Sequence, residues 1–446
     1  MILEDTDHDG KLDKRTVFLD KVHLPRAIAV FPDGVLFTDD KELRWQKRDG
    51  LKPVGAAEVA VPGWVKAGNV EHKTNGLMRN LDNWLYNAKS SQRVRRINGK
   101  WVAENTLFRG QWGIAHDDYG RLYHNHNSTI LSGDLVAPNL LAGNPGVELK
   151  AQEYVALGTN NTWPARVTPG VNRAYVAKKN GYPEDTLDPA TNKLKLTTAA
   201  AGLTIYRGTN FPSEWLGRGL VTEPSVNLVK VVKIDEANGK LTGSHPYGQT
   251  EWLASTDERF RPVNIYNSPD GAVLMLDMYH GIIQDKTFMT TYLRDQYLSR
   301  GLDKPGTGNG RIYRIRSAAG KLEKAVDFEK LSSEEVAKML VHKNGWHRDT
   351  AQRVLVDRGD AAVVPQLEKM VGVAGEPLGV INALWTLEGM GKLDGKVVGT
   401  VLGMSEPKVV CSGLWAATKL SAGELAKVGD AILAIQPKTD EVKIYL

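Results

Sequence analysis

The chain has a single cysteine, Cys411, among its 446 residues. One cysteine excludes an intrachain disulfide and an attached c-type haem, which needs a Cys-x-x-Cys-His segment. Lysine and arginine form no long run, so the net charge of +5 does not indicate nucleic-acid binding. No apolar stretch reaches the length of a membrane span, and residues 1–5 lack the basic and apolar regions of a signal peptide. We therefore expect neither nucleic acid nor a membrane span.

Turn-forming residues are abundant, with 44 glycines and 20 prolines. In residues 259–280, two β-prone runs flank Pro269, Asp270 and Gly271, which is typical of a β-hairpin. Residues 27–37, 76–86 and 113–123 repeat this pattern, and strand patterns return at 201–207 and 219–234. Sheets that recur about every forty to fifty residues are typical of β-propellers. The sequence thus predicts a mainly β domain over residues 1–317, a six-bladed propeller with an incomplete first blade.

The hydrophobic period becomes helical after Ser317. Ser332 and Glu335 form a helix start signal, and three related apolar segments follow at 350–359, 382–391 and 412–420. A repeat of about thirty residues predicts a HEAT-like helical solenoid over residues 318–446. Cys411 falls inside this array as a small buried hydrophobic residue.

Carboxylates alternate at Asp5, Asp7 and Asp9, ahead of Gly10, as they do in calcium loops. Thr16 stands where an EF-hand has its bidentate glutamate, so an acidic turn without calcium is the other interpretation.

Two further patterns concern histidine and arginine. His124 and His126 alternate on a predicted strand, so they share one face of it. They are either a metal-binding pair or a surface pair, and no third ligand occurs at a spacing that is typical of a metal site. The region 136–198 reads as long loops, in which Arg166 and Arg173 are candidate anion contacts. Residues 292–297 predict a short helix.

His72 lies just ahead of a predicted channel-lining strand. A histidine there can reach solvent and titrate near neutrality, as a general base must, although a lone histidine also serves structural roles.

Five segments together resemble a known class of proteins: DTDHDGKLDKRTVF, EHKTNGLMRNLDNWLY, FRGQWGIAHDDYGRL, ASTDERFRPVNIYNSPDG and DMYHGIIQ. They resemble the PQQ-type propeller dehydrogenases, the soluble glucose, aldose-sugar and sorbosone dehydrogenase class. More closely, the chain is similar to the large membrane-associated dehydrogenase-like family of planctomycetes and verrucomicrobia, which joins such a propeller to HEAT repeats and often to a cytochrome c module. On this resemblance the chain is a fragment without the family's export signal and cytochrome.

The resemblance implies roles for particular residues. His72 corresponds to the catalytic base, which takes the hydroxyl proton as hydride passes to the quinone. Three arginines correspond to cofactor contacts. Arg109 lies four residues before a strand-opening glycine, and Arg259 and Arg261 precede a Pro-Asp turn. Asn227 stands where the class uses a lysine. PQQ is a tricarboxylate, which suits guanidinium groups.

The sequence also departs from the class. Gly110 replaces an asparagine, and no equivalent of the calcium-binding Gly-Pro occurs near residues 125–128. A weaker enzyme or a different ligand would follow, because calcium polarises the cofactor.

The expected function is that of a PQQ-dependent oxidoreductase that transfers hydride from a sugar or sugar-alcohol hydroxyl to the quinone. Its cofactors would be PQQ and calcium, its electron acceptor an external partner such as a cytochrome c, and its location, as for the parent family, the periplasm or cell envelope. The alternative is a non-catalytic propeller that binds glycan or protein, with the HEAT repeats as a docking surface.

Overall fold

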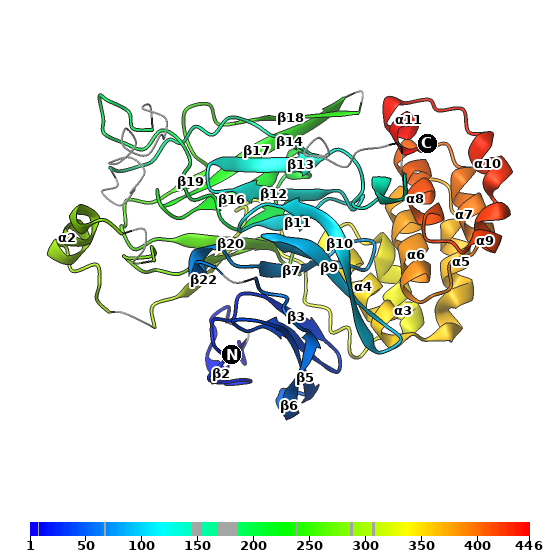
Figure 1. Ribbon diagram of the computed structural model, residues 1–446, viewed down its shortest axis with the longest axis horizontal. Helices are drawn as coiled ribbons and strands as arrows, with labels where there is room; N and C mark the ends of the chain where they lie inside the picture. Colours follow the sequence, from blue (N-terminus) through cyan, green and yellow to red (C-terminus); the bar gives the residue numbers. More distant parts are fainter. Residues whose placement is uncertain are drawn as a thin grey trace. The chain divides into compact units, whose positions relative to one another are not determined.

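The structure is a computed structural model (Figure 1) that describes residues 1–7, 9–66, 68–144, 146, 154–167, 186–237, 239–285, 289–305 and 308–446. Contacts divide it into two compact units, residues 1–79 with 84–108, and residues 80–83 with 109–446. Each unit has its own apolar core. The helices thus group with the later blades, and the predicted domain boundary at residue 317 stays a prediction.

The first unit contains two four-stranded antiparallel sheets. The strands of the first sheet are β3 (Ile28–Phe31), β4 (Gly34–Thr38), β5 (Leu43–Asp49) and β6 (Lys52–Val61), and those of the second are β7 (Asn75–Arg79), β8 (Leu85–Ala88), β9 (Ser90–Ile97) and β10 (Lys100–Arg109). A separate pair joins β1 (Ile2–Glu4) to β2 (Lys14–Thr16). Leu36, Trp45 and Trp64 lie in the core of this unit. The hairpins predicted at 27–37 and 76–86 are confirmed.

The second unit begins with three more antiparallel sheets. Their strands are β11 (Ile114–His116), β12 (Leu122–His126), β13 (Thr129–Asp134) and β14 (Tyr154–Ala156); β15 (Leu203–Ile205), β16 (Gly219–Glu223), β17 (Leu228–Ala237), β18 (Lys240–Ser244) and β19 (Leu253–Ala254); and β20 (Pro262–Asn267), β21 (Val273–Asp277) and β22 (Arg311–Ile315). The described residues thus form a β-propeller-like series of five blade sheets. A sixth blade stays a prediction.

The first strands of the blades in the second unit lie beside one another. The backbone N–H of Gly202 donates to the carbonyl of Val263 at 2.9 Å, which links the start of one blade to the first strand of the next. In an antiparallel sheet, the segment before the first strand and the loop between the second and third strands emerge at the same end. These segments form the loop region in which the candidate site lies.

One predicted strand region is a hairpin instead. Residues 219–234 split into β16 and β17, joined by a turn that ends at Asn227. Pro224 lacks a backbone N–H for the ladder, and Asn227 adopts a φ of 60°, which asparagine tolerates better than β-branched residues do.

Ten α-helices occur in the described part of the chain, nine of them after residue 332. They are α2 (Thr291–Ser299), α3 (Ser333–Lys338), α4 (Gly345–Arg358), α5 (Val364–Val371), α6 (Pro377–Gly389), α7 (Gly395–Leu402), α8 (Pro407–Ala417), α9 (Ala422–Ala426), α10 (Gly429–Leu433) and α11 (Asp440–Tyr445). The capping box of Ser332 and Glu335 is confirmed, as is the helix predicted at 292–297. Helix α6 packs against α4 and α8, and α5 against α7, so alternate helices stack.

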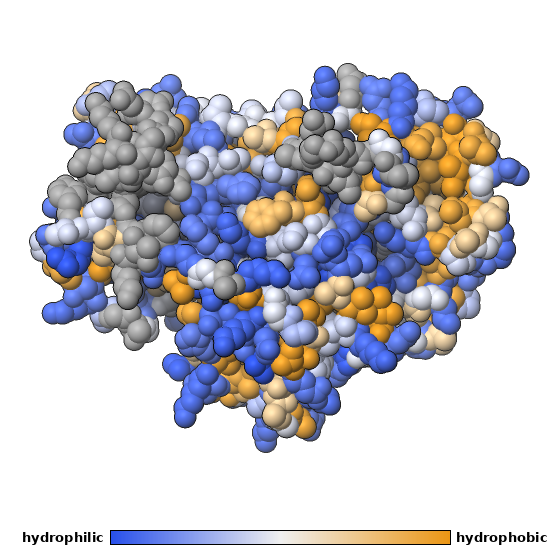
Figure 2. Space-filling model, viewed as in Figure 1, coloured by the Kyte–Doolittle hydropathy of each residue, from blue (hydrophilic) through white to orange (hydrophobic). Residues whose placement is uncertain are grey.

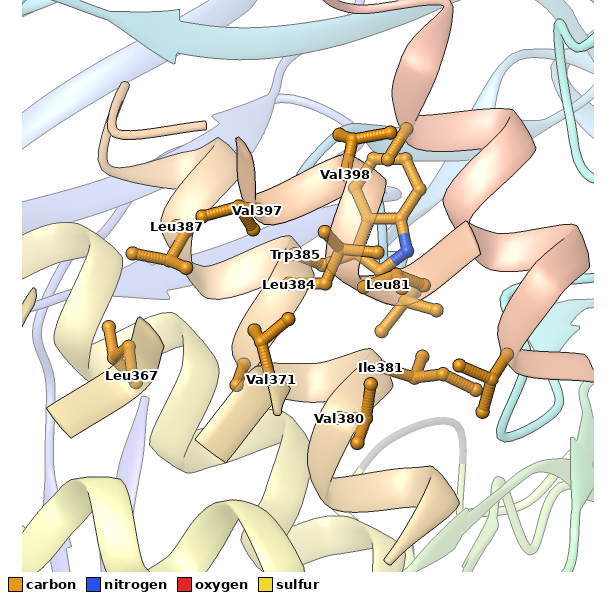
Figure 3. Packing of buried hydrophobic residues seen from close by; sticks show 14 of the residues in the cluster. Leu81, Leu367, Val371, Val380, Ile381, Leu384, Trp385, Leu387, Val397 and Val398 are labelled. Atoms are coloured by element: carbon orange, nitrogen blue, oxygen red, sulfur yellow. The ribbon is translucent and has the colours of Figure 1, made fainter. Parts of the chain in front are cut away.

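The helical core contains Leu81, whose side chain lies among the labelled residues of Figure 3. The indole N–H of Trp385 donates to the hydroxyl of Ser412 at 2.9 Å, and the amide of Asn83 donates to the carbonyl of Trp385 at 2.8 Å. Residues 80–83 are therefore part of the second unit, since Leu81 buries its side chain there, worth about 1.5–3 kcal/mol. Cys411 is buried as predicted, and burial raises the pKa of its thiol to about 12.

The surface of the helical end is partly apolar. Figure 2 shows apolar residues over the C-terminal helices, where Leu433 is 84% exposed. Among the described residues, no helix combines the length and apolar character that a membrane crossing requires.

Candidate anion-binding site

The segment before β20 carries two of the predicted cofactor contacts. Arg259 lies in a turn that begins at Asp257, and its backbone N–H donates to the carboxylate of Asp257 at 2.9 Å. Arg261 is 3% exposed, and its guanidinium donates to the carbonyls of Pro224 at 2.7 Å and Gly281 at 3.0 Å. Arg261 therefore fixes the β16–β17 turn and the segment after β21 against the start of β20.

Asn227 joins the same loop region. Its buried side-chain amide donates to the carbonyl of Phe260 at 2.5 Å, and its backbone carbonyl accepts from Ser255 N at 2.9 Å. On its other side, Asn227 Oδ1 lies 3.5 Å from a guanidinium nitrogen of Arg166. The structure thus brings Asn227 next to the segment of Arg259 and Arg261, as a turn residue rather than a strand residue.

Four guanidiniums gather here, which we call the arginine cluster: Arg166, Arg259, Arg261 and Arg300. Arg166 and Arg300 both pair with the carboxylate of Glu258, and a terminal nitrogen of Arg300 lies 2.5 Å from it. Arg259 instead donates to the carbonyls of Gly301 at 3.0 Å and Lys304 at 3.2 Å, in the loop after α2.

The charge balance of the arginine cluster is positive. Burial lowers the pKa of Arg166; Glu258 opposes this shift, while the neighbouring charges of Arg261 and Arg300 add to it. Like charges held together at partial burial raise the electrostatic potential, and that potential favours an anionic ligand.

Two aspartates frame the cluster. The hydroxyl of Tyr279 donates to Asp257 at 2.8 Å, and the guanidinium of Arg311 lies 3.4 Å from the centre of the Tyr279 ring. Asp277 accepts the backbone N–H groups of Arg261 and Tyr279, both at 2.7 Å, through Oδ1. Its Oδ2 is buried without a hydrogen-bond partner in the described part of the chain, and burial raises the pKa of this carboxyl group.

Arg109 is the last residue of β10 and belongs to the second unit, ahead of β11. Its guanidinium is 1% exposed and is held by Asp134, with its Nε 2.9 Å and a terminal nitrogen 2.8 Å from Oδ2. In this arrangement Arg109 positions a buried carboxylate, and its contact with a cofactor stays a prediction. Gly110 follows with a φ of 59°, and a Cβ there would lie 2.7 Å from the carbonyl oxygen of Asn125. Any side chain at this position would collide with that carbonyl oxygen, which explains why the chain has glycine where the class that it resembles has asparagine.

His124 lies close to the same pair, 4.0 Å from Asp134. Its side chain is fully buried, so the predicted surface position of the His124 and His126 pair is wrong for His124. Alternation along a strand predicts that His126 shares a face of the sheet with His124. Whether that face is buried depends on the packing of other segments against it. Burial, and then the charge of Arg109, lower the pKa of His124 to about 3.

His72 belongs to the first unit. It is exposed and ends the short helix η1 (Val70–His72), which Asn69 caps by accepting from Glu71 N at 2.8 Å. The helix leads directly into β7, so His72 precedes the first strand of its blade, as Arg109 and Arg261 precede theirs.

The acidic loop also has a defined geometry. Ligand oxygens of Asp5, Asp7 and Asp13 lie within 4.8 Å of one another. Asp9, the third predicted calcium ligand, instead accepts the backbone N–H of Lys11 at 2.7 Å. Asp13 takes its place in the group, while also accepting from Thr6. His8 of this loop and the candidate anion contact Arg173 lie outside the described residues.

Sequence reasoning found the Arg-x-Arg pair, Asn227 and Arg166 but missed Glu258, Asp277 and Arg300. Glu258 and Asp277 occur within the quoted motifs, so their polarity next to the arginines was a usable signal. Arg300 had none, because it is 41 residues beyond Arg259 in an irregular loop.

The blade series and the arginine cluster together define a propeller-like protein with a cationic loop region. A family model described as "Domain of unknown function (DUF7133)" matches residues 1–319, and the chain belongs to this family. No curated protein matches the sequence.

Several solved structures are similar to the chain. One, described as an oxidoreductase (glucose dehydrogenase) from Thermus thermophilus, is 14% identical over 58% of this chain and 91% of its own, with a TM-score of 0.30. A second glucose dehydrogenase is 14% identical over 59% of this chain and 95% of its own, with a TM-score of 0.31. A virginiamycin B lyase from Staphylococcus aureus is 12% identical over 56% of this chain and 76% of its own, with a TM-score of 0.26. Similarity at this level assigns no activity.

Proposed function

We propose that the protein is a quinoprotein-like oxidoreductase that oxidises a hydroxyl of a sugar or sugar-derived alcohol, and that its cofactor PQQ binds at the arginine cluster. The observation that carries the proposal is the excess of guanidinium over carboxylate: of the four arginines in the cluster, only Arg166 and Arg300 pair with a carboxylate in the described residues, and both pair with Glu258. A polycarboxylate ligand would complete the charge balance of these groups.

The donor set fits such a ligand in part. The side chains of Arg166 and Arg300 are 14% and 41% exposed, so both can turn toward a bound carboxylate. Arg261 is already bonded to carbonyl groups, and its role is to hold the loops in place. When bound, PQQ would supply a two-electron acceptor for hydride.

His72 is the base that we propose for this reaction. Its exposure allows the imidazole to take a proton from a substrate hydroxyl and release it to solvent. Asn227 and Arg109 would support the loops of the cofactor site, and calcium would bind in the acidic loop through Asp5 and Asp7, with Asp9 or Asp13.

The helical part would have a separate role. We interpret the stacked helices α4 to α8 as HEAT-like repeats that dock a partner, such as the cytochrome c that accepts the electrons. A location in the periplasm or cell envelope belongs to the same proposal.

Absorbance titration of the purified protein with PQQ, with and without calcium, tests the proposal. We expect a saturable spectral change that weakens several-fold in Arg300→Gln. The matched control is Arg294→Gln, an arginine on α2 that is 57% exposed and pairs with Asp295 outside the cluster. Absence of binding, or equal binding by both variants, would overturn the cofactor site and leave the non-catalytic propeller as the better interpretation.

Turnover is then measured with a panel of aldoses and an artificial electron acceptor. His72→Gln should abolish turnover while PQQ still binds, and the control His23→Gln, at a histidine that is 74% exposed, should retain it. Full activity in His72→Gln would exclude this residue as the base.

A further inference from the structure

Three potential metal ligands meet where the last blade gives way to the helices of the second unit. Glu323 follows β22, His342 caps η5 (Met339–Val341), and His347 lies in the first turn of α4. One ligand atom from each of them lies within 4.8 Å of the others. The three side chains come from segments that the sequence separates by 24 residues at most, yet no motif spacing marks them.

His347 has a lone pair that the fold does not use. Its side chain is 1% exposed, and its Nε2 lies 2.9 Å from the carbonyl oxygen of Pro269, so Nε2 carries the proton that is donated. Nδ1 is buried and has no hydrogen-bond partner among the described residues. A histidine that binds a metal commonly donates its other ring N–H to a backbone carbonyl in this way. A buried nitrogen without a partner is otherwise unfavourable.

Glu323 is held in place by its neighbours. The hydroxyl of Thr209 donates to Oε1 at 2.6 Å, and the side-chain amide of Asn344 donates to Oε2 at 3.2 Å. Oε2 also lies 3.5 Å from Nε2 of His347. Hydrogen bonds of this kind orient a carboxylate ligand before the ion arrives. The side chain is 25% exposed, which gives an ion a path from solvent.

His342 completes the group. Its ring centre lies 4.4 Å from that of His347, and its Nδ1 accepts the backbone N–H of Asn344 at 3.1 Å. Arg348 donates to the carbonyls of His342 and Lys343, which fixes this corner of the backbone. Ligation by His342 would replace the single bond from Asn344.

We propose that Glu323, His342 and His347 bind a zinc ion. Two imidazoles and one carboxylate suit zinc, and a water molecule would fill the fourth tetrahedral position. The ion joins the segment after the last blade to the start of α4, so it stabilises the junction between blades and helices. This site is independent of the proposed oxidoreductase activity.

The test uses the full chain after dialysis against a chelator. Cobalt(II) is added as a spectroscopic probe, and zinc then competes for the same site. We expect one equivalent of cobalt to give the intense visible bands of tetrahedral coordination, zinc to displace it, and zinc to raise Tm. Glu323→Gln and His342→Asn should each weaken binding at least tenfold, and His23→Gln should not.

Melting of each variant in chelator shows that it folds before metal is added. If Glu323→Gln fails to fold, His342→Asn, at a half-buried position, carries the test. Asp7→Asn is a further control, because loss of the cobalt signal in that variant would assign the ion to the acidic loop. The absence of tetrahedral cobalt bands, or binding that is the same in the wild type and both ligand variants, would overturn the proposal.

Discussion

Two arginine networks in the second unit differ in charge balance and exposure. The first, which we call the junction network, joins Arg207 and Arg348 to Asp118 and Asp349. It holds two arginines and two aspartates, and its arginine side chains are 6% and 2% exposed. The arginine cluster instead contains four arginines, of which Arg166 and Arg300 pair with Glu258, and Arg300 is 41% exposed.

The difference separates a structural role from the binding role that we propose for the arginine cluster. The junction network connects the β11–β12 turn and the segment after β15 to α4, and its charges are already matched. Matched charges leave little affinity for a further ion. The arginine cluster has unmatched positive charge in a loop region, where an anion can reach it.

Arg207→Met should have the largest effect on stability. The substitution leaves two aspartates near one remaining arginine, and breaking a fully buried pair costs about 3–5 kcal/mol. Solvent reaches Asp349, which is 36% exposed, so we expect about 2–4 kcal/mol in urea unfolding. Arg300→Met in the arginine cluster should change stability by less than about 0.5 kcal/mol. Equal losses in the two variants would contradict the comparison.

Acid should destabilise the protein through the junction network. Burial opposes ionisation of Asp118, but the charges of Arg207 and Arg348 outweigh it and lower its pKa below 3.8. The folded state thus binds the proton less readily than the unfolded state, so this contribution is present above pH 3.8 and is lost as pH falls below it. Unfolding free energy measured against pH should decline less steeply below about pH 4 in Asp118→Asn. An unchanged slope would show that other groups dominate.

Salt should act on the arginine cluster and spare the junction network. Citrate serves as the probe here, because it is a tricarboxylate that needs no redox chemistry. Screening acts on exposed charges, with a Debye length of about 10 Å at 0.1 M salt and about 3 Å at 1 M. We expect calorimetry to show citrate binding about fivefold weaker at the higher salt, with urea unfolding little changed. Binding that does not depend on salt would point to a different kind of ligand.

Glu258→Gln should have the smallest effect. Removing this carboxylate frees Arg166 and Arg300 for a ligand, and partly exposed pairs contribute about 0–1 kcal/mol. Citrate affinity should therefore rise about twofold to fivefold. A loss of affinity would mean that Glu258 positions the two arginines, and the cluster would then resemble the junction network.

Local sequence signals predicted the elements of the fold well. The turn at Pro269, Asp270 and Gly271 and the capping box at Ser332 both specify the backbone within four residues, so the hairpin and α3 followed directly. The split at Asn227 was missed because Val226 and Leu228 continue the apolar pattern on both sides of the turn.

The site was predicted only where its residues are neighbours in sequence. Arg259 and Arg261 could be found because they flank the start of a strand. Arg300 could not, since its contact with Glu258 crosses 42 residues. Burial of His124 was equally hidden, because it depends on Tyr154 and Asp134 packing around the ring.

The sequence by itself determined the change from blades to helices, the hairpin turns and the positions of the charged residues along the chain. Period and turn chemistry act over a few residues, and for that reason they can be read without a structure. Only the tertiary structure decided which arginines would be neutralised. Arg109 was paired with Asp134 at the end of β13 and Arg207 with Asp349 in α4, whereas Arg166 and Arg300 came to share one glutamate. Such pairings depend on distances between segments, and residue order does not contain those distances.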